Sequence, residues 1–397
     1  MKTAMVVFSH YPSDPRVRRE AEALADEGGE VHVICLRGEG ESPVESFRNI
    51  IVHRLDIQRK RGRKLSYISE YVRFILMSSV KLAALHIKYR YRLVHVHNMP
   101  DILVFTALVP KLTGSKIILD LHDPMPEVYM AKYGMKREDY FIRFLKYLEK
   151  KSISFADRIL TPNIAFKNLF LNRGCPEAKI QIVMNSPQES IFDSQYSSTG
   201  KKKEGQHFVL MYHGTIVERH GLGVALDAIK QLQKAIPNIR FHVFGDGDSY
   251  YQKFMERINE LGLQKIVQVH GRVSLEKIAS AIEEVDIGII PNNKNVFTDL
   301  NFPTRIFEYL SKGKPVVVPR TRGIQDYFKE NEIFYFDPGN PENLAKTILN
   351  IYSNRSYRDQ VQMNSQEIYY SCQWKNQKKV YIDLVKQLVG PTHLETQ

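Results

Sequence analysis

Polar side chains that could bind a charged ligand lie directly after predicted strands in both halves of the chain. Five histidines share this position, each behind a short apolar run: His10, His97, His122, His213 and His270. In an open parallel sheet, ligands bind beyond the carboxyl ends of the strands. A single histidine after a strand often only hydrogen-bonds the backbone of its loop. Five histidines in this position favour a ligand-binding edge of the sheet in each half of the chain. The pattern is typical of an enzyme with a cleft between two sheets.

A second signal is a helix start that is led by proline. Pro303 suits the first turn of a helix, where its missing N–H costs nothing. The N–H groups of Thr304 and Arg305 then form a site for an anion, and the guanidinium of Arg305 adds positive charge. Glu308 lies one turn further on. A surface ion pair between Arg305 and Glu308 is the alternative explanation of this spacing.

Strands that alternate with helices must position these side chains. Short β-branched apolar runs alternate with amphipathic segments along nearly the whole chain, the pattern of parallel sheets covered by helices. The predicted strands of the first half are 4–8, 31–36, 50–55, 93–97, 116–121, 158–161 and 180–184. Those of the second half are 208–212, 240–244, 266–269, 287–290, 315–318 and 333–336. We therefore predict an α/β protein with two Rossmann-like domains.

A polar segment separates the two sets of strands. Residues 194–206 contain the run Ser-Ser-Thr-Gly-Lys-Lys-Lys-Glu-Gly, which has little to bury and is typical of a linker. We expect an N-terminal domain at 1–193 and a C-terminal domain at 207–372. Residues 373–397 are expected to form a helix that packs back on the N-terminal domain.

The composition excludes several classes of protein. Hydrophobic residues make up 43% of the 397 residues, too many for a disordered chain. The three cysteines, Cys35, Cys175 and Cys372, lie far apart, which argues against a disulfide scaffold or a cysteine zinc site and suits a reducing compartment. The sequence shows neither a signal peptide nor an apolar run that could span a membrane. We expect a cytoplasmic protein.

The formal net charge of +12 is concentrated in one segment. Residues 59–92 hold ten basic side chains and one acidic one, Glu70. Apolar residues recur there with helical spacing, at Leu65, Ile68, Val72, Ile75 and Leu82. Four basic residues are predicted to share one stripe of the helix: Arg73, Lys81, Lys88 and Arg92. Such a helix favours peripheral attachment to an anionic membrane, on its cytosolic face, over binding of nucleic acid. A core-packing helix with a solvated basic face is the alternative.

Five stretches of the chain resemble motifs of glycosyltransferase family 4, whose members are retaining, nucleotide-sugar-dependent enzymes of the GT-B fold. The stretches are 10–20, 120–123, 213–221, 271–273 and 302–310. The resemblance implies two Rossmann-like domains whose parallel sheets face a central cleft. It places the nucleotide-sugar donor in the C-terminal domain and the acceptor in the N-terminal one, and closure then excludes water. It implies no cofactor, and no metal if arginines neutralise the departing diphosphate.

The resemblance also assigns roles to individual residues. Its catalytic residues here are His122, Arg219, Arg305 and Glu308. His122 would contact the primary hydroxyl of the donor sugar, Glu308 the ribose, and the two arginines the diphosphate. A structural histidine in a proline-rich loop is the alternative for His122. Further donor-binding candidates are Gly214, Thr215, Val273, Asp299, Asn301, Phe302 and Thr304.

On the acceptor side the candidates are His10, Arg16, Asp123 and Glu127. Asp123 and Glu127 follow His122 closely, so they are expected either to orient it or to bind acceptor hydroxyls. Arg16 lies in a cluster with Arg18 and Arg19. The three arginines either bind an anionic group of a substrate or are solvated charges on a helix.

The chain departs from the family pattern at two places. The family usually carries Glu-x7-Glu, but Leu300 stands where the first glutamate belongs. Either Asp299 takes its place, or backbone amides of 300–302 hold the sugar and the β-phosphate. Thr215 and His220 occupy positions where the family often has arginine and lysine, which leaves Arg219 as the nearest strong cation. The Asp-Gly-Asp at 246–248 resembles a metal-binding motif but is better explained as a turn after a strand.

Together these features predict a retaining hexosyl- or N-acetylhexosaminyl-transferase. A UDP-sugar donor is favoured over a GDP-sugar, and the acceptor would be a glycan or a lipid-linked glycan in the synthesis of cell-surface polysaccharide or glycoconjugates. Two alternatives stay open. A sugar-nucleotide epimerase can have a similar two-domain architecture, and the absent glutamate is compatible with a non-catalytic nucleotide-binding paralogue.

Overall fold

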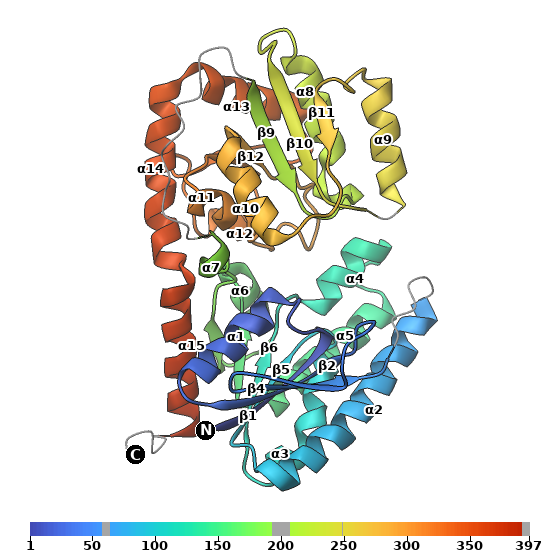
Figure 1. The fold of residues 1–397 in the computed structure, drawn as a ribbon. Coiled ribbons are helices and arrows are strands. Elements are labelled where there is room, and N and C mark those ends of the chain that lie inside the picture. Colours follow the sequence, from blue (N-terminus) through green and yellow to red (C-terminus); the bar gives the residue numbers. More distant parts are fainter. Residues whose placement is uncertain (58–63, 193–206, 248, 391–397) are drawn as a thin grey trace. The chain divides into compact units, whose positions relative to one another are not determined.

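The computed structural model describes residues 1–57, 64–192, 207–247 and 249–390 (Figure 1). The chain divides into two compact units: unit 1 comprises 1–185 with 375–397, and unit 2 comprises 186–374. The predicted linker 194–206 and the start of the basic segment, 59–63, lie outside the described residues.

Unit 1 is built on an eight-stranded sheet in the order β3-β4-β2-β1-β5-β6-β7-β8. Its strands are β1 (Lys2–His10), β2 (Glu30–Leu36), β3 (Val44–Phe47), β4 (Ile50–Leu55), β5 (Leu93–His97), β6 (Lys116–Asp120), β7 (Arg158–Thr161) and β8 (Ile180–Ile182). All neighbours are parallel except β3 and β4. The central strands are buried almost throughout, as expected of a parallel sheet with both faces covered.

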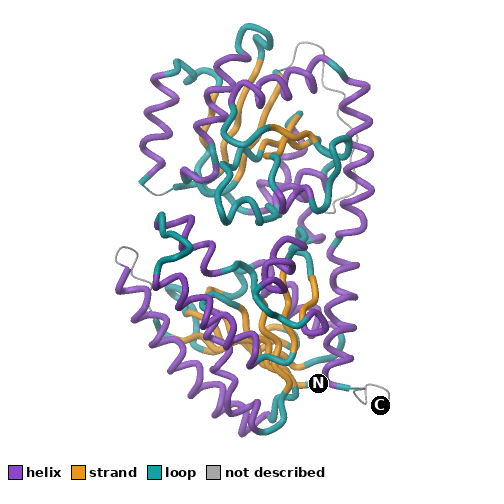
Figure 2. Tube along the Cα trace, turned by 180° about the vertical axis from the view of Figure 1, so that it is seen from behind, coloured by secondary structure: helices purple, strands orange, loops and turns teal. Residues whose placement is uncertain are grey.

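Helices cover both faces of this sheet (Figure 2). They are α1 (Pro15–Asp26), α2 (Lys64–Tyr89), η1 (Asp101–Ala107), α3 (Leu108–Leu112), α4 (Met125–Tyr133), α5 (Tyr140–Phe155), α6 (Ile164–Asn172), η2 (Glu177–Lys179) and α15 (Trp374–Val389). Asp14 begins α1 by accepting the N–H of Val17, as an N-cap residue does. Helix α15 contacts the sheet through Tyr381, whose hydroxyl lies 2.9 Å from Nδ1 of His95.

Unit 2 holds a fully parallel six-stranded sheet in the order β11-β10-β9-β12-β13-β14. This is the 3-2-1-4-5-6 order of a Rossmann domain, with its switch point between β9 and β12. The strands are β9 (Phe208–His213), β10 (Ile239–Phe244), β11 (Val267–Val269), β12 (Ile287–Ile289), β13 (Val316–Pro319) and β14 (Phe334–Phe336). The helices are α7 (Glu189–Phe192), η3 (Glu218–His220), α8 (Leu222–Leu232), α9 (Tyr250–Glu260), α10 (Leu275–Glu284), α11 (Arg305–Ser311), α12 (Arg322–Gln325), α13 (Pro341–Ser353) and α14 (Arg355–Cys372).

Helix α2 differs from the predicted basic helix. Arg92 lies beyond its end and Lys81 is half-buried, so the expected stripe of four basic residues does not form. The face that packs on the unit carries Phe74, Ser78, Leu82 and His86. The solvent face is instead an apolar ridge, which we define as Val72, Leu76, Val80, Ala84 and Ile87. No helix among the described residues is long and apolar enough to cross a membrane.

Candidate active site

The carboxyl edge of the unit 2 sheet brings together His213, from the end of β9, and two side chains of α11. Nε2 of His213 lies 2.5 Å from Oε2 of Glu308, and its Nδ1 lies 3.0 Å from the hydroxyl of Tyr309. That hydroxyl also donates to the carbonyl of Met211 at 2.9 Å. The ring is thereby fixed, and the His213–Glu308 bond leaves the second oxygen of the Glu308 carboxylate for another partner.

Arg305 lies next to this pair but does not bridge to Glu308. Its Nη1 donates to the carbonyl of His213 at 2.6 Å, and its guanidinium carbon lies 4.8 Å from the ring centre of Tyr212. Gly214 makes this approach possible, because a Cβ there would lie 2.9 Å from Nη1 and the φ of +129° suits glycine. The predicted alternative, a surface ion pair between Arg305 and Glu308, is therefore wrong.

The loop after Gly214 carries little positive charge of its own. Nδ1 of His220 lies 2.7 Å from the carbonyl of Thr215 and 3.0 Å from the hydroxyl of Tyr212. Burial, with the nearby Arg305, lowers the pKa of His220 to about 3, so this ring is neutral. Arg219 is exposed on η3 and remains the cation that this loop offers to a diphosphate.

The loop before α11 is held by its own side chains. Asp299, the predicted substitute for the absent glutamate, lies 3.1 Å from Nζ of Lys294 and accepts the backbone N–H of Arg322. This engagement argues against Asp299 taking the place of the glutamate. The ring of Phe302 is buried 4.8 Å from that of Phe307, so Phe302 can offer a ligand only its backbone.

The remaining donor candidates line the same edge of the sheet. Asn301 and Thr304 are partly exposed beside α11, and Val273 is partly exposed in the loop after β11. The carboxylate and guanidinium of α11, the exposed Arg219 and these loop residues together provide groups that can bind a ribose and a diphosphate.

His122 occupies the corresponding edge of the unit 1 sheet, just beyond β6. Its Nε2 lies 3.1 Å from Oδ2 of Asp120 and 3.1 Å from Nδ1 of His97. Asn98 accepts its backbone N–H at 2.8 Å. With Nε2–H donated inward, the Nδ1 lone pair is the part of this partly exposed ring that can accept a substrate hydroxyl.

The predicted role of Arg16 as an anion-binding or solvated charge is wrong. The side chain is buried, and Nε and Nη2 donate to the two oxygens of Asp120 at 2.7 and 2.9 Å. Nη1 donates to the carbonyl of Val183, so the guanidinium is fully used inside the unit. Arg18 pairs with Glu22 on the helix surface, and Arg19 is buried against Asn185.

Of the other acceptor-side candidates, Glu127 points into the unit, whereas His10 lies at the end of a strand as expected. Glu127 is buried and pairs with Arg173, which also bonds Glu149 at 2.8 Å, so it holds α4 to its neighbours. His10 ends β1 with Nδ1 buried and without a hydrogen-bond partner among the described residues. Asp123 remains partly exposed beside His122, and its carbonyl accepts from Asn98.

Sequence reasoning missed a buried cluster behind His122. Glu20, His95, His97 and Asp120 have donor atoms within 4.8 Å of one another. Both oxygens of Glu20 and Nε2 of His95 and His97 have no hydrogen-bond partner among the described residues. The signal was the His-x-His pattern of β5, because residues two apart on a strand share one face.

The charges of this cluster do not suit a divalent cation. Burial alone would raise the pKa of Asp120, but Arg16 and His122 hold it well below its ordinary value. Burial and the neighbouring Asp120 raise the pKa of Glu20, and burial lowers that of His95. Arg16 thus already balances the one ionised carboxylate. We conclude that the cluster supports His122 through Asp120 and His97.

Comparison with known proteins identifies the family. The family model described as Glycosyltransferase Family 4 matches residues 16–186, and Glycosyl transferases group 1 matches 195–368. The chain is 24% identical to the sulfoquinovosyl transferase SQD2 of Arabidopsis thaliana over 66% of this chain and 50% of the relative. It thus spans about half the length of that relative. It is 23% identical to an uncharacterized glycosyltransferase of Methanocaldococcus jannaschii over 85% of this chain and 86% of the relative. The amylovoran biosynthesis glycosyltransferase AmsK of Erwinia amylovora is 25% identical over 45% of this chain and 43% of the relative.

Solved structures share the fold of the chain. Sucrose-phosphate synthase from Thermosynechococcus elongatus matches with a TM-score of 0.77 at 17% identity, over 98% of this chain and 99% of that one. HepE of Anabaena, solved in complex with UDP-glucose, matches with a TM-score of 0.70 at 15% identity, over 98% of this chain and 100% of that one. The fold is thus that of the GT-B glycosyltransferases. With both family models matched, the chain belongs to glycosyltransferase family 4 and is a glycosyltransferase.

Proposed function

We propose that the protein transfers a hexosyl or N-acetylhexosaminyl group from a nucleotide sugar, with retention and without a metal or cofactor. The acceptor is a glycan or lipid-linked glycan of cell-surface polysaccharide synthesis. The observation that carries the proposal is the hydrogen bond of 2.5 Å that fixes Glu308 on His213, with Arg305 on the neighbouring carbonyl. It offers a carboxylate oxygen for ribose hydroxyls beside a guanidinium for a diphosphate.

A UDP-sugar is the donor that we favour over a GDP-sugar. Support comes from HepE, which shares the fold and was solved with UDP-glucose. Within unit 2, Arg219 and Arg305 would stabilise the negative charge that builds on the departing diphosphate. With two arginines in this role, the diphosphate does not need a metal ion to neutralise it. Attack from the face of the leaving group, with its phosphate as the base, would retain the anomeric configuration.

An apolar crevice in unit 1 favours a lipid-linked acceptor. The crevice has a volume of about 160 Å³ and is lined by residues of α2, η1, α4 and α5, among them Val72, Ile102, Met125 and Phe144. Met125 follows His122 by three residues, so an aliphatic chain in the crevice would hold its glycan close to His122. Val72 also begins the apolar ridge, which makes the crevice continuous with the exposed face of α2.

The apolar ridge would seat unit 1 on an anionic membrane surface. Its four large side chains are each more than half exposed, a cost in water that burial in the lipid interface relieves. Arg73 and Lys88 are exposed beside the ridge and carry the charge that anionic headgroups attract. Our proposal thus replaces the predicted basic stripe by an apolar ridge with basic flanks as the membrane contact.

Titration calorimetry with UDP and GDP, followed by acceptor-dependent release of the nucleotide, tests this function. A glycosyltransferase binds one nucleotide tightly and releases it from its sugar conjugate only when an acceptor is present. Altered sugar nucleotide or free sugar in the absence of an acceptor would indicate an epimerase. Binding of the nucleotide with no turnover on any acceptor would indicate a non-catalytic paralogue.

A further inference from the structure

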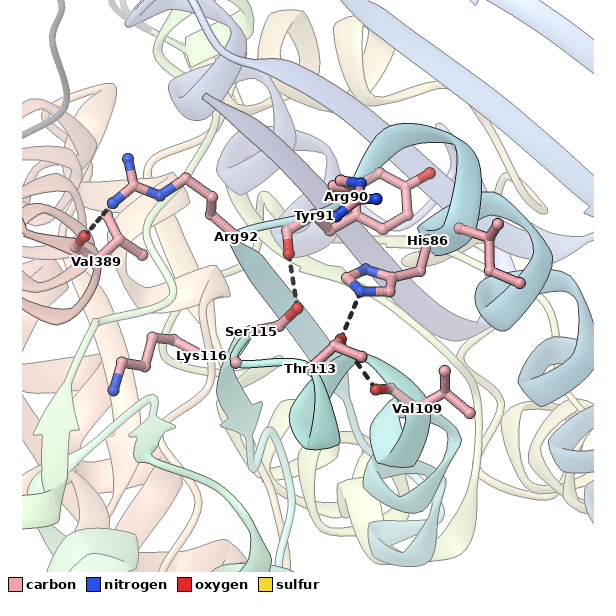
Figure 3. Close-up of a pocket in the computed structure, with 11 residues that line it drawn as sticks. His86, Arg90, Tyr91, Arg92, Val109, Thr113, Ser115, Lys116 and Val389 are labelled. Atoms are coloured by element: carbon pink, nitrogen blue, oxygen red, sulfur yellow. Dashed lines mark hydrogen bonds between the residues drawn. The ribbon is translucent and has the colours of Figure 1, made fainter.

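A second pocket opens at the amino-terminal edge of the unit 1 sheet, the edge opposite to His97 and His122. We call it the basal pocket. It has a volume of about 540 Å³, within the range of ligand sites. Its walls come from the end of α2, the turn between α3 and β6, and the last residue of α15, and they include His86, Arg90, Arg92, Thr113, Lys116 and Val389 (Figure 3).

Three exposed cations line the basal pocket and no carboxylate does. Arg92 and Lys116 stand at the starts of neighbouring strands, because the N–H of Lys116 donates to the carbonyl of Arg92 at 2.9 Å. Their side chains extend to the same side (Figure 3). Across the described parts of the chain, neither these two nor Arg90 has a carboxylate within 4.0 Å. Asp157 accepts the N–H of Ile117, the residue after Lys116, but its carboxylate is already paired with Lys111.

Helix ends do not cancel this charge. The carboxyl ends of α2, α3 and α15 reach the pocket, and each contributes roughly half a negative charge. Three cations therefore leave an excess of roughly one and a half positive charges. Lys2 and Lys88 lie at the same edge, where their ammonium groups are 5.2 and 4.9 Å from the ring centre of Tyr89, and the carboxylate of Glu30 partly offsets them.

The backbone at Arg90 supports a role for its side chain. Arg90 follows α2 with φ of +51°, the left-handed conformation in which glycine is most often found at the end of a helix. A guanidinium is present where glycine would be under less strain. Below it, Nε2 of His86 bonds the hydroxyl of Thr113 at 2.7 Å, whereas Nδ1 is buried without a partner among the described residues. The pocket thus holds an unsatisfied polar atom beside its cations.

The rim of the basal pocket is apolar. Ile87, the last residue of the apolar ridge, lines it together with Val109, and Leu112 is exposed one turn along α3. A basic interior with an apolar rim matches a phosphate group that belongs to a lipid, with the phosphate in the pocket and the rim in the acyl region.

We propose that the basal pocket binds a phosphate group, which the positive charges of Arg90, Arg92 and Lys116 attract into it. Two sources offer this chemistry, the headgroup of an anionic lipid and a soluble phosphate compound. The site lies at the edge of the sheet away from His122, so it does not depend on the transferase activity that we propose.

The test uses the full-length protein and the double variant Arg90→Gln with Lys116→Gln, which leaves the bond from Arg92 to Val389 intact. Lys253→Gln with Lys265→Gln, exposed residues of unit 2, is the control that removes the same charge. One arm titrates glycerol phosphate and follows the NMR signals of the His86 ring, which a phosphate site in unit 2 would not move. The other arm measures binding to vesicles of phosphatidylcholine with phosphatidylglycerol.

We expect the pocket variant to bind at least one probe about thirtyfold more weakly than the wild type, since each basic residue near a surface of this kind contributes about fivefold. The control should bind as the wild type does. A loss in both arms, or with vesicles only, identifies a lipid headgroup as the ligand, and a loss with glycerol phosphate only identifies a soluble one. Equal binding by the two variants in both arms, with no movement of the His86 signals, would overturn the proposal.

Discussion

The imidazole of His213 is hydrogen-bonded to the carboxylate of Glu308, 95 residues further along the chain, at 2.5 Å. The bond joins the end of β9 to the first turn of α11 at the switch point of the unit 2 sheet. Because one oxygen of the carboxylate is held in this way, the other has a fixed direction. In the function that we propose, this contact orients the carboxylate that binds the ribose of the nucleotide.

Removal of the bond should weaken nucleotide binding. His213→Phe keeps an aromatic ring against Tyr309 but leaves Glu308 without its partner. Hydrogen bonds to charged groups contribute roughly 1.5–3 kcal/mol, so the Kd for UDP should rise by about tenfold or more, as measured by calorimetry. His242→Phe, on the neighbouring strand β10, is the matched control and should bind normally. An unchanged Kd in His213→Phe would show that Glu308 needs no orientation.

The buried pair of Arg16 and Asp120 should be essential for the stability of unit 1. Arg16→Met leaves an ionised Asp120 without compensation in the core, so the free energy of unfolding in urea should fall by about 3–5 kcal/mol. Arg18→Met breaks the partly exposed pair with Glu22 and should cost roughly 0.5 kcal/mol. Equal effects of the two substitutions would contradict the buried network.

Glu20 should make the stability depend on pH. Burial and Asp120 raise its pKa in the folded state above the unfolded value of about 4.3. The folded protein therefore binds the extra proton, and this contribution to stability is complete below pH of about 4 and is lost as the pH rises towards the folded pKa. Glu20→Gln should flatten the fall in unfolding free energy as the pH rises above about 5, by up to about 1.4 kcal/mol per pH unit. A slope identical to that of the wild type would mean that Glu20 is ionised in the folded protein.

Membrane attachment should depend on the apolar ridge more than on Lys81. Leu76→Glu with Val80→Glu places two charges in the face that we propose enters the lipid, so co-flotation with anionic vesicles should fall at least tenfold. Met363→Glu, an exposed residue of α14 in unit 2, is the control and should float as the wild type does. Flotation that survives the ridge variant but is lost on charge reversal at Lys81 and Lys88 would restore the basic stripe as the contact.

The sequence predicts the layered α/β fold well, because buried parallel strands consist of short apolar runs that can be recognised in the sequence. Strand β3 was not predicted, because its four residues are exposed and it pairs antiparallel at the edge of the sheet. Helix α2 shows the limit of periodicity. Its apolar residues lie on both faces, and the buried face includes Ser78 and His86, so spacing alone could not tell which face is solvent-exposed.

The candidate site was predictable where its parts lie in one motif. Arg305 and Glu308 share a helix and a recognisable stretch, and the structure places both beside His213. Arg16 was not predictable, since its partner Asp120 is 104 residues away and no local pattern links a helix arginine to a strand aspartate. Pairing of this kind becomes visible only when the sheet brings α1 and β6 together.

The most direct test of the central claim is the turnover of Arg305→Ala at saturating donor, with the nucleotide sugar that the binding panel selects. If Arg305 stabilises the departing diphosphate, kcat should fall by at least about a hundredfold while the fold stays intact by circular dichroism. Glu308→Gln should likewise abolish transfer, whereas Arg257→Ala, a surface arginine of α9, should turn over normally. Near-normal kcat in Arg305→Ala or in Glu308→Gln would contradict the assignment of this site.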